Sequence, residues 1–167
     1  MNINKSFLGR SSMLAVAVLV VGGGVALASD SSRSDVPTAA AGPETVFTVV
    51  ERATTDTVVY VNPTHDDVIG NTLGFGNSLY GPQNVKRVGR DQGLCYRTNP
   101  GKSWECTFTN VLPHGRITVQ GVFPDSLADS RMAITGGTGK YAAARGYMVL
   151  HARNKAGTAY DFEFHVL

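Results

Sequence analysis

The sequence predicts an all-β fold, built as an antiparallel sandwich or barrel of about eight short strands. Three observations favour this class. Apolar and polar residues alternate along most of the chain, helical periodicity is almost absent, and turn signals separate the alternating segments at nearly regular spacing. A chain of 167 residues with this pattern has room for one such domain.

The alternating segments account for the expected strands. In chain order they are 45–52, 57–61, 71–80, 84–97, 103–111, 116–123, 131–135, 147–153 and 159–166. The second segment is either a continuation of the first or a short separate strand. Dipeptides such as Asn62-Pro63, Gly81-Pro82 and Pro100-Gly101 mark the turns between segments. Only Lys140–Ala144 is expected to form a helical turn.

The first 28 residues have the layout of a secretory signal peptide. Lys5 and Arg10 precede an apolar run that ends in the small-x-small sequence Ala26-Leu27-Ala28. We expect cleavage after Ala28 and a secreted or extracytoplasmic protein. A flexible leader over 29–43 and a folded domain over 44–167 would follow.

An uncleaved membrane anchor is the alternative for the N-terminus. It would use the apolar run of residues 13–28. This run is sixteen residues long and includes three consecutive glycines, which is short for a membrane span of about 20 residues. The signal peptide is therefore the preferred interpretation.

The chain that follows the signal peptide is electrically balanced, with 13 acidic and 13 basic residues. It lacks the basic excess of nucleic-acid-binding proteins, so no nucleic acid is expected as a partner. The four histidines, at positions 65, 114, 151 and 165, have no metal-ligand spacing, and no Ser-His-Asp order stands out. No metal or other cofactor is therefore expected.

One glycine-rich segment, Gly137–Ala142, fits the dinucleotide-binding pattern G-x-G-x-x-A. A nucleotide site would require a long helix after the glycines, inside a parallel β-α-β unit. Here about one helical turn separates two alternating segments. The sequence therefore predicts a structural corner at Gly136–Gly139, with a positive φ at one or more of its glycines, and no phosphate site.

The two cysteines are expected to face each other across a hairpin. Counting outward from a turn centred on Pro100-Gly101 pairs Cys95 with Cys106. Directly opposed antiparallel residues can lie about 4.5 Å apart at Cα, which suits a disulfide, and export would allow oxidation. The bridge is the preferred interpretation. A free Cys95 acting as a catalytic thiol and two buried reduced thiols are the alternatives.

Several motifs resemble, in the same order, those of allene oxide cyclases and dirigent proteins. FGNSLYGPQNVKRVGRDQGLC (75–95) and GRITVQG (115–121) resemble cyclase segments, and ITGGTGKYAAARGY resembles the GGTG-x-F-x-x-ARGY stretch of dirigent proteins. The likeness covers residues 67–151 well. It implies a single eight-stranded antiparallel β-barrel with an apolar lumen, similar to a lipocalin. Such barrels are usually oligomeric, so a dimer or trimer is possible here.

The families that this chain resembles carry out their chemistry without a cofactor. Allene oxide cyclases close a ring from a reactive epoxide, dirigent proteins steer radical coupling, and bacterial barrels of similar pattern close polyketide rings. A shaped apolar pocket that orients a reactive substrate would serve all three. The expected partner of this chain is therefore a small apolar molecule bound in the lumen.

Five residues match motif positions in these families. Phe75, Asn77 and Tyr80 fall in F-x-N-x-LY, Cys95 in GLC and Arg145 in ARGY. The resemblance places Cys95 in the cavity wall. It also suggests Phe75 and Tyr80 as cavity residues. Arg145 is expected either at the cavity mouth or in a salt bridge at the glycine corner.

The catalytic acids of both families are not matched. With the chain aligned on Glu51-Arg52, Thr48 takes the place of the cyclase's catalytic glutamate, and Asp56-Thr57 replaces the Ser-Pro that follows. Gly76-Asn77 replaces the paired acids of the dirigent F-D-D-P strand. The resemblance therefore implies the fold and neither chemistry.

Three residues are candidates for catalysis. Asn77 could orient a substrate oxygen, or pair with backbone at a bulge. Asp91 shares a strand face with Cys95 and could act as a general acid, because burial would raise its pKa. A salt bridge with Arg97 is the alternative for Asp91. Cys95 is a candidate only as a free thiol.

Two aromatic residues are further candidates for the cavity wall. Trp104 and Phe108 lie on the same strand face as Cys106. They would line a ligand cavity if the lumen is open, and fill the core if it is closed.

Three functions are compatible with an apolar barrel of this kind. They are a cofactor-free cyclase or stereo-guide, a non-catalytic carrier of an apolar ligand, and an envelope interaction protein with a filled lumen. The missing family acids favour the carrier. A measurable cavity would argue against the filled lumen, and two facing polar groups deep in an open lumen would favour the cyclase or guide.

Overall fold

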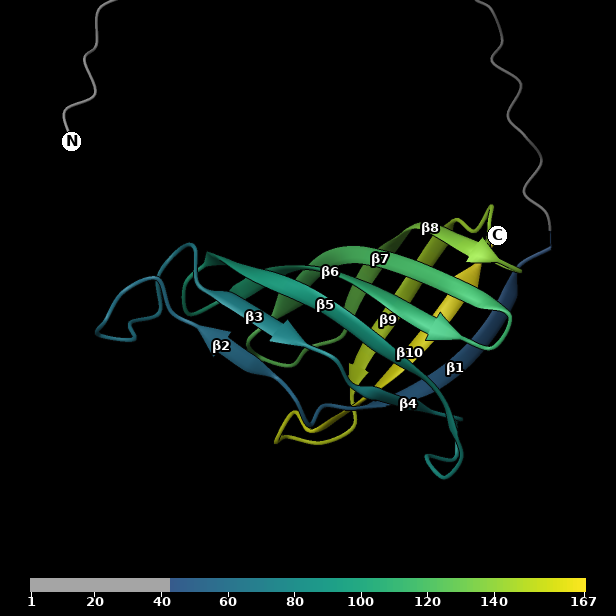
Figure 1. Cartoon of the computed structure of the whole chain (residues 1–167), viewed down its shortest axis with the longest axis horizontal. Helices are drawn as coiled ribbons and strands as arrows, with labels where there is room; N and C mark the ends of the chain where they lie inside the picture. Colours follow the sequence, from purple (N-terminus) through teal and green to yellow (C-terminus); the bar gives the residue numbers. More distant parts are fainter. Residues whose placement is uncertain (1–42) are drawn as a thin grey trace, which may run out of the picture. The chain divides into compact units, whose positions relative to one another are not determined.

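The computed structural model describes residues 43–167, which form ten antiparallel β-strands (Figure 1). Their bounds are β1 Thr45–Arg52, β2 Thr57–Val59, β3 Thr72–Phe75, β4 Ser78–Tyr80, β5 Arg87–Asn99, β6 Ser103–Leu112, β7 Gly115–Pro124, β8 Ser130–Gly139, β9 Gly146–Ala152 and β10 Ala159–Val166. No residue in this range is helical. The predicted all-β class is confirmed.

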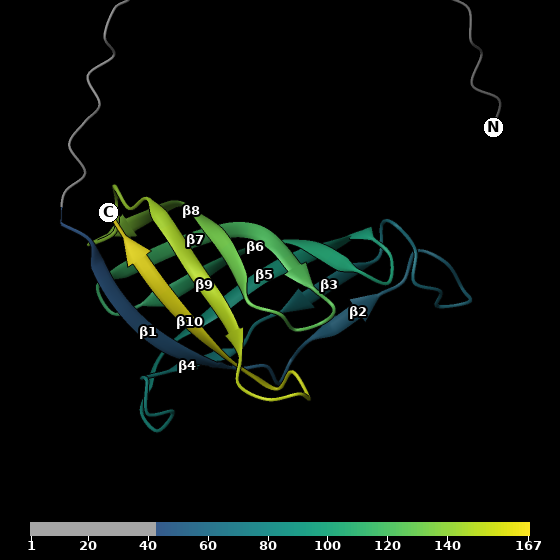
Figure 2. The same ribbon diagram turned by 180° about the vertical axis from the view of Figure 1, so that it is seen from behind.

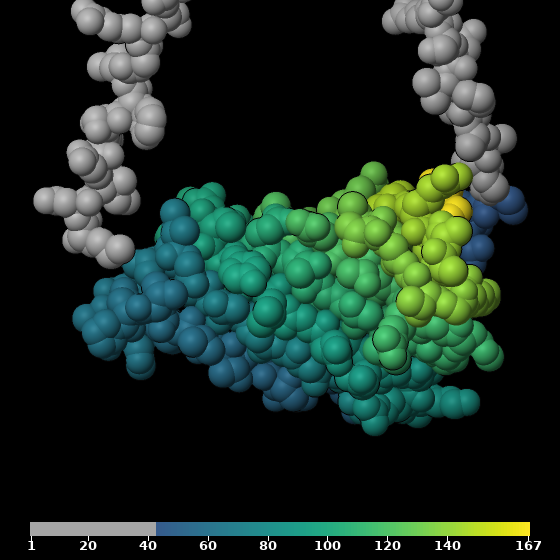
Figure 3. Space-filling model, turned by 45° about the horizontal axis from the view of Figure 1, so that its top comes forward, coloured from purple at the N-terminus to yellow at the C-terminus, as the bar shows by residue number. Residues whose placement is uncertain are grey.

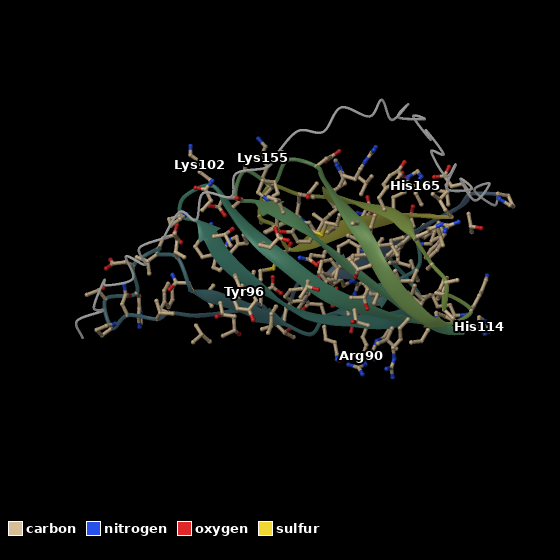
Figure 4. All side chains as sticks on the ribbon, turned by 90° about the horizontal axis from the view of Figure 1, so that it is seen from above. Arg90, Tyr96, Lys102, His114, Lys155 and His165 are labelled. Carbon is tan, nitrogen blue, oxygen red and sulfur yellow. A yellow bond between two sulfur atoms is a disulfide. The ribbon has the colours of Figure 1, made fainter. Side chains whose placement is uncertain are left out.

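Eight of the strands close a barrel, as predicted. Around the ring the order is β1, β4, β5, β6, β7, β8, β9 and β10, and β10 pairs with β1 to complete the circle. The ring is visible from both sides of the molecule (Figures 1 and 2). Successive hairpin turns alternate between its two ends. Lys102 and Lys155 therefore lie at one end, and His114 lies at the other (Figure 4).

The two remaining strands are β2 and β3. Short irregular segments separate β2 from β1 and β3 from β4. β3 and β4 both pair with β5 in one continuous register, from Thr72↔Tyr96 to Ser78↔Arg90, but the strand is interrupted at Gly76. The single strand predicted over 71–80 is therefore two strands. β2 pairs with β3 and follows β1 after a second interruption.

The two interruptions lie opposite each other on adjacent strands of the sheet. Val50 pairs with Tyr80, and Thr57 pairs with Gly74. Thr57 is seven residues after Val50, but Gly74 is only six residues before Tyr80, so the segment between β1 and β2 has one extra residue. One extra residue in one strand is the count of a β-bulge. The bulge turns the backbone of residues 53–56 out of the ladder and leaves a place that a side chain must fill.

The barrel interior is packed by side chains from alternate positions of every strand. The residues of the core are Val49, Leu79, Cys95, Trp104, Cys106, Phe108, Leu112, Ile117, Val119, Met132, Ile134, Met148, Leu150, Tyr160, Phe162 and Phe164. Each is less than 9% exposed. The interior is therefore apolar over most of its length, as the resemblance implied.

Strands β5 and β6 extend past the ring together with β3 and β2. In the space-filling view the blue segment, which holds β2 and the loop after it, projects at one end of the barrel (Figure 3). Arg97 anchors this end: its guanidinium contacts Asp67 at 2.6 Å and Asp125 at 2.7 Å, and stacks 3.9 Å from the ring centre of Trp104. One buried cation thus joins the loops that follow β2 and β7.

The glycine-rich corner differs from the prediction in its secondary structure. β8 continues through residues 136–139, whereas the predicted strand ends at Thr135. Lys140–Ala144 forms hydrogen-bonded turns and no helical turn, so that expectation was wrong. The predicted positive φ is confirmed at Gly139, whose φ is 60° and whose added Cβ would lie 2.3 Å from the His114 carbonyl oxygen.

The predicted signal peptide lies outside the described residues. The same holds for the alternative anchor over 13–28 and for the leader up to residue 42. Within residues 43–167 there is no helix with the length and apolar character needed to cross a membrane.

Candidate functional site

A pocket opens from the lumen at the end of the barrel where β1 ends and β10 begins. Its lining residues are Glu51, Asp56, Leu73, Phe75, Cys95, Cys106, Phe108, Phe123, Met132, Leu150, Tyr160 and Phe162. Its cavity volume is about 40 Å³, and about 380 Å³ with the open mouth included. This lumen is not completely filled by side chains.

Aromatic rings form much of the pocket wall. Phe108 lies between Phe75 and Phe162, with ring centres 5.5 and 5.6 Å away. Phe123 and Tyr160 form a second, edge-to-face pair at 5.8 Å. These separations are those of favourable aromatic contacts, so the walls are held as two rigid clusters.

Three carboxyl groups gather beside this apolar wall, and we call them the acid cluster: Glu51, Asp56 and Asp91. Asp56 is exposed at the pocket mouth, Glu51 is 5% exposed and Asp91 is fully buried. Glu51 lies on the inward face of β1 with Phe47 and Val49. Within residues 43–167 no three His, Cys, Asp or Glu side chains are arranged to hold a metal ion.

Asn77 fills the place left by the two strand interruptions and joins the acids to the backbone. Its Nδ2 donates to Glu51 Oε1 and to Asp56 Oδ1, both at 2.8 Å. Its Oδ1 accepts from the backbone amides of Thr54 and Thr55 at 3.0 Å. Both amide protons and the carbonyl are therefore used within the protein. Of the two predicted roles, this geometry matches pairing at a bulge and leaves no hydrogen for a substrate oxygen.

Glu51 and Asp91, which we call the carboxyl pair, are close enough for a hydrogen bond when one of them is protonated. Burial raises the pKa of Glu51 well above 4.5, and the neighbouring Asp91 carboxyl raises it further. Burial also raises the pKa of Asp91 from 3.8 to about 6, against the lowering effect of hydrogen bonds from Glu51 and from the Asn77 backbone amide. Two carboxylates this close in an apolar site cannot both stay ionised. Burial therefore favours a carboxyl pair that carries one proton.

Tyr160 completes the polar side of the pocket. It pairs with Glu51 across the β1–β10 ladder and is 6% exposed. Burial, followed by the nearby charges of Glu51 and Asp56, raises the pKa of its hydroxyl to about 12. The phenol therefore stays protonated and can act only as a neutral hydrogen-bonding group.

This arrangement can donate and accept a proton at one wall of an apolar pocket. Glu51 reaches the pocket, and Asp91 lies behind it as the partner that takes up the charge. Asp91 Oδ2 is buried, and no N–H or hydroxyl group of residues 43–167 donates a hydrogen bond to it. A carboxyl whose pKa is raised toward neutrality is suited to general acid–base work.

The structure brings some of the predicted site residues together. Of the predicted cavity and catalytic residues, Phe75, Phe108 and Cys95 line the pocket. Asp91 is buried beside it, but the predicted alternative partner Arg97 is wrong, because Arg97 pairs with Asp67 and Asp125.

Three predicted cavity residues lie elsewhere. Tyr80 stands on the outer face of the wall under Arg52, whose guanidinium lies 3.8 Å from its ring centre. Arg145 is exposed near the end of β10, at the opposite end of the barrel from the pocket. Trp104 faces inward but packs against Arg97 and is not part of the pocket lining.

Cys95 and Cys106 form the predicted disulfide. They are directly paired between β5 and β6, with Cα atoms 3.9 Å apart, and both are 2% exposed. The interpretation of Cys95 as a free catalytic thiol is therefore wrong for this oxidised structure. The two sulfurs instead form part of the pocket wall.

The sequence interpretation missed Glu51 and Asp56. It judged the first strand by its alignment to the cyclase motif, which puts Thr48 at the place of the family glutamate. The alternation of Phe47, Val49 and Glu51 was the signal that could have found the site, because it sets an acid on the face that the apolar residues bury.

Comparisons with solved structures show the same barrel. A pyocyanin demethylase superimposes with a TM-score of 0.58 at 27% identity, over 71% of this chain and 98% of that one. A pterocarpan synthase dirigent protein gives 0.55 at 19% identity, over 74% and 92%. An exo-specific intermolecular Diels-Alderase gives 0.58 at 12% identity, over 75% and 98%. The last two likenesses concern the fold alone.

A family assignment comes from the sequence comparison. The model of the family described as Dirigent-like protein matches residues 38–167, which is most of the chain and includes every strand of the barrel. The eight-stranded ring and the order of the matched motifs agree with this assignment. The chain therefore belongs to the dirigent-like protein family.

Proposed function

We propose that this chain is an exported barrel that binds a small, largely apolar molecule in its lumen. It would steer the cyclisation or coupling of that molecule without a cofactor. The observation that carries the proposal is the carboxyl pair, Glu51 and Asp91, set at the wall of an aromatic pocket.

The pocket and the pair together distinguish the three functions that the sequence left open. A measurable cavity argues against a barrel whose lumen is filled only for structure. Facing polar groups argue against a passive carrier, because a carrier of an apolar ligand gains nothing from buried acids that cost solvation free energy. Both observations support a catalyst or guide.

Glu51 is the proposed general acid, and Asp91 the partner that stabilises the charge left behind. Aromatic walls on two sides of the pocket would restrict the conformations of a bound substrate and bring its reacting atoms together. Asn77 is a positioning residue, because it contacts the acids and the backbone and has no free hydrogen-bonding group.

The names of the similar structures are compatible with this proposal. One protein is a synthase of pterocarpans, one a Diels-Alderase and one a demethylase of pyocyanin. The first two names describe formation of ring systems. They support a ring-forming or ring-modifying reaction for this chain and leave its substrate open.

Substrate capture followed by a matched substitution tests the proposal. The exported protein is purified without detergent, and its bound small molecules are identified by mass spectrometry. Each candidate is then incubated with wild-type protein, Glu51→Gln and Glu163→Gln. Glu163 is an exposed acid on the neighbouring strand β10, so it controls for the same change of charge outside the pocket.

We expect Glu51→Gln to lower the conversion rate by about 100-fold, the usual effect of losing a general acid, and Glu163→Gln to leave it unchanged. Equal rates for all three proteins would exclude the proposed role of Glu51. A captured ligand that no protein converts would favour the carrier.

A further inference from the structure

The acid cluster has no cationic partner in the part of the chain that the structure describes. The ion pairs of residues 43–167 lie elsewhere: Arg97 pairs with Asp67 and Asp125, and Arg153 with Asp161. The three remaining pairs involve His151 and His165, which lie outside the pocket. Even with one proton on the carboxyl pair, the acid cluster carries negative charge at one wall, and no basic side chain of the described residues pairs with it.

Uncompensated buried acids are costly, and this cost is visible in their protonation. Burial is the first cause of the raised pKa values of Glu51 and Asp91. The charge of Asp91 raises the pKa of Glu51 further, and the charge of Asp56 raises that of Asp91. Asn77 supplies only the dipole of a neutral amide. A positive charge at the pocket wall would favour the ionised acids and remove much of this cost.

The opposite walls of the pocket also suit a cation. The rings of Phe75, Phe108, Phe123, Tyr160 and Phe162 line the space beside the acids. Aromatic faces carry partial negative charge and attract cations, most strongly where water is excluded. A flat positively charged ring could therefore stack against the rings while its charge faces Glu51 and Asp56.

We infer that the pocket selects a flat aromatic molecule that carries one positive charge, such as a ring with a protonated or alkylated nitrogen. This inference rests on the proposed lumenal ligand and narrows its chemical class. Two separate observations carry it: an acid cluster without a basic partner, and a pocket of about 40 Å³ whose other lining is aromatic, aliphatic and sulfur-containing.

Three probes of nearly equal shape test the charge requirement. N-methylquinolinium is cationic, methylnaphthalene is neutral and naphthoate is anionic. Neutral naphthol is added as a fourth probe, because it can donate a hydrogen bond to a carboxylate without carrying charge. Dissociation constants are measured near neutral pH by calorimetry, with quenching of Trp104, the one tryptophan of the chain, as a second readout.

We expect the cation to bind about tenfold more tightly than methylnaphthalene, and naphthoate to bind most weakly. The double variant Glu51→Gln, Asp56→Asn should reduce this preference to about twofold or less while keeping the affinity for methylnaphthalene. Glu163→Gln should keep the full preference.

The outcomes separate this inference from the proposed function. If methylnaphthalene or naphthol binds as tightly as the cation, the inference is overturned and the lumenal site stands. If the double variant keeps the preference for the cation, groups other than Glu51 and Asp56 recognise the charge, and the inference also fails. If no probe binds and no small molecule co-purifies, the lumenal ligand itself is excluded.

Discussion

Asn77 joins two features that are far apart in the sequence, the broken strands and the acids. Its side chain spans from the amides of Thr54 and Thr55 to the carboxyl groups of Glu51 and Asp56. An amide can do this because it carries two donors and an acceptor on one planar group. At the scale of single residues, the site therefore depends on a side chain that performs no chemistry.

The carboxyl pair should make the protein less stable as the pH rises. The folded chain holds the Asp91 proton more tightly than the unfolded chain, so unfolding releases protons and the free energy of unfolding falls with increasing pH. The change spans the window from 3.8, the ordinary pKa, to about 6, the raised pKa of Asp91, and amounts to about 3 kcal/mol. Urea unfolding of wild type and Asp91→Asn, measured from about pH 4 to about pH 8, tests this.

The wild type should lose stability relative to Asp91→Asn across that window. Parallel curves for the two proteins would mean that Asp91 does not titrate as described. His165 must be controlled, because hydrogen bonds from its ring to Glu163 and Glu44 raise its pKa and act in the same direction at higher pH. Repeating both curves in a His165→Gln background removes the contribution of the histidine, so the remaining difference comes from the Glu51–Asp91 pair.

At the scale of elements, the close approach of β5 and β6 shapes the pocket. Gly93 pairs with Phe108, and the disulfide of Cys95 and Cys106 joins the two strands covalently two residue pairs further along. A Cβ added at Gly93 would lie 2.2 Å from Phe108 Cβ and 2.5 Å from the Thr107 carbonyl oxygen. The missing side chain at Gly93 is thus what lets Phe108 lie across the lumen.

Gly93→Ala should lower stability by about 2 to 3 kcal/mol or more, because the added methyl group meets backbone atoms that cannot rotate away. Gly74→Ala is the matched control on the neighbouring strand β3. Its added Cβ would make only an ordinary contact, 3.5 Å from Leu94 Cδ2. Thermal unfolding of the three proteins by calorimetry gives the comparison. A Gly93→Ala melting temperature equal to that of Gly74→Ala would contradict the prediction.

At the scale of the whole molecule, the barrel could be predicted from sequence and the acid site could not. Strand alternation and turn chemistry are local signals, and they were sufficient for the all-β class and for the Cys95–Cys106 pairing. The closed eight-stranded ring was implied by the resemblance of the ordered motifs. The acid cluster depends on contacts between Asn77 and residues 21 and 26 positions away. It also depends on two strand breaks whose alignment is visible only after the sheet has formed. Local alternation could have placed Glu51 on the inward face of its strand, but it could not show that two other acids converge there.

Export and oxidation should occur together in this molecule. The basic start, the apolar run and the A-x-A sequence predict cleavage after Ala28. The disulfide closes a short loop, with a sequence separation of 11, and should contribute about 2 to 3 kcal/mol by limiting the unfolded chain. When the full chain is expressed with its own N-terminus, protein from the medium or envelope should begin at Ser29. Intact mass after alkylation without reductant should then show no modified thiol. A chain that begins at Met1 in the membrane fraction would contradict the cleavage, and two alkylated cysteines in the folded exported protein would contradict the bridge.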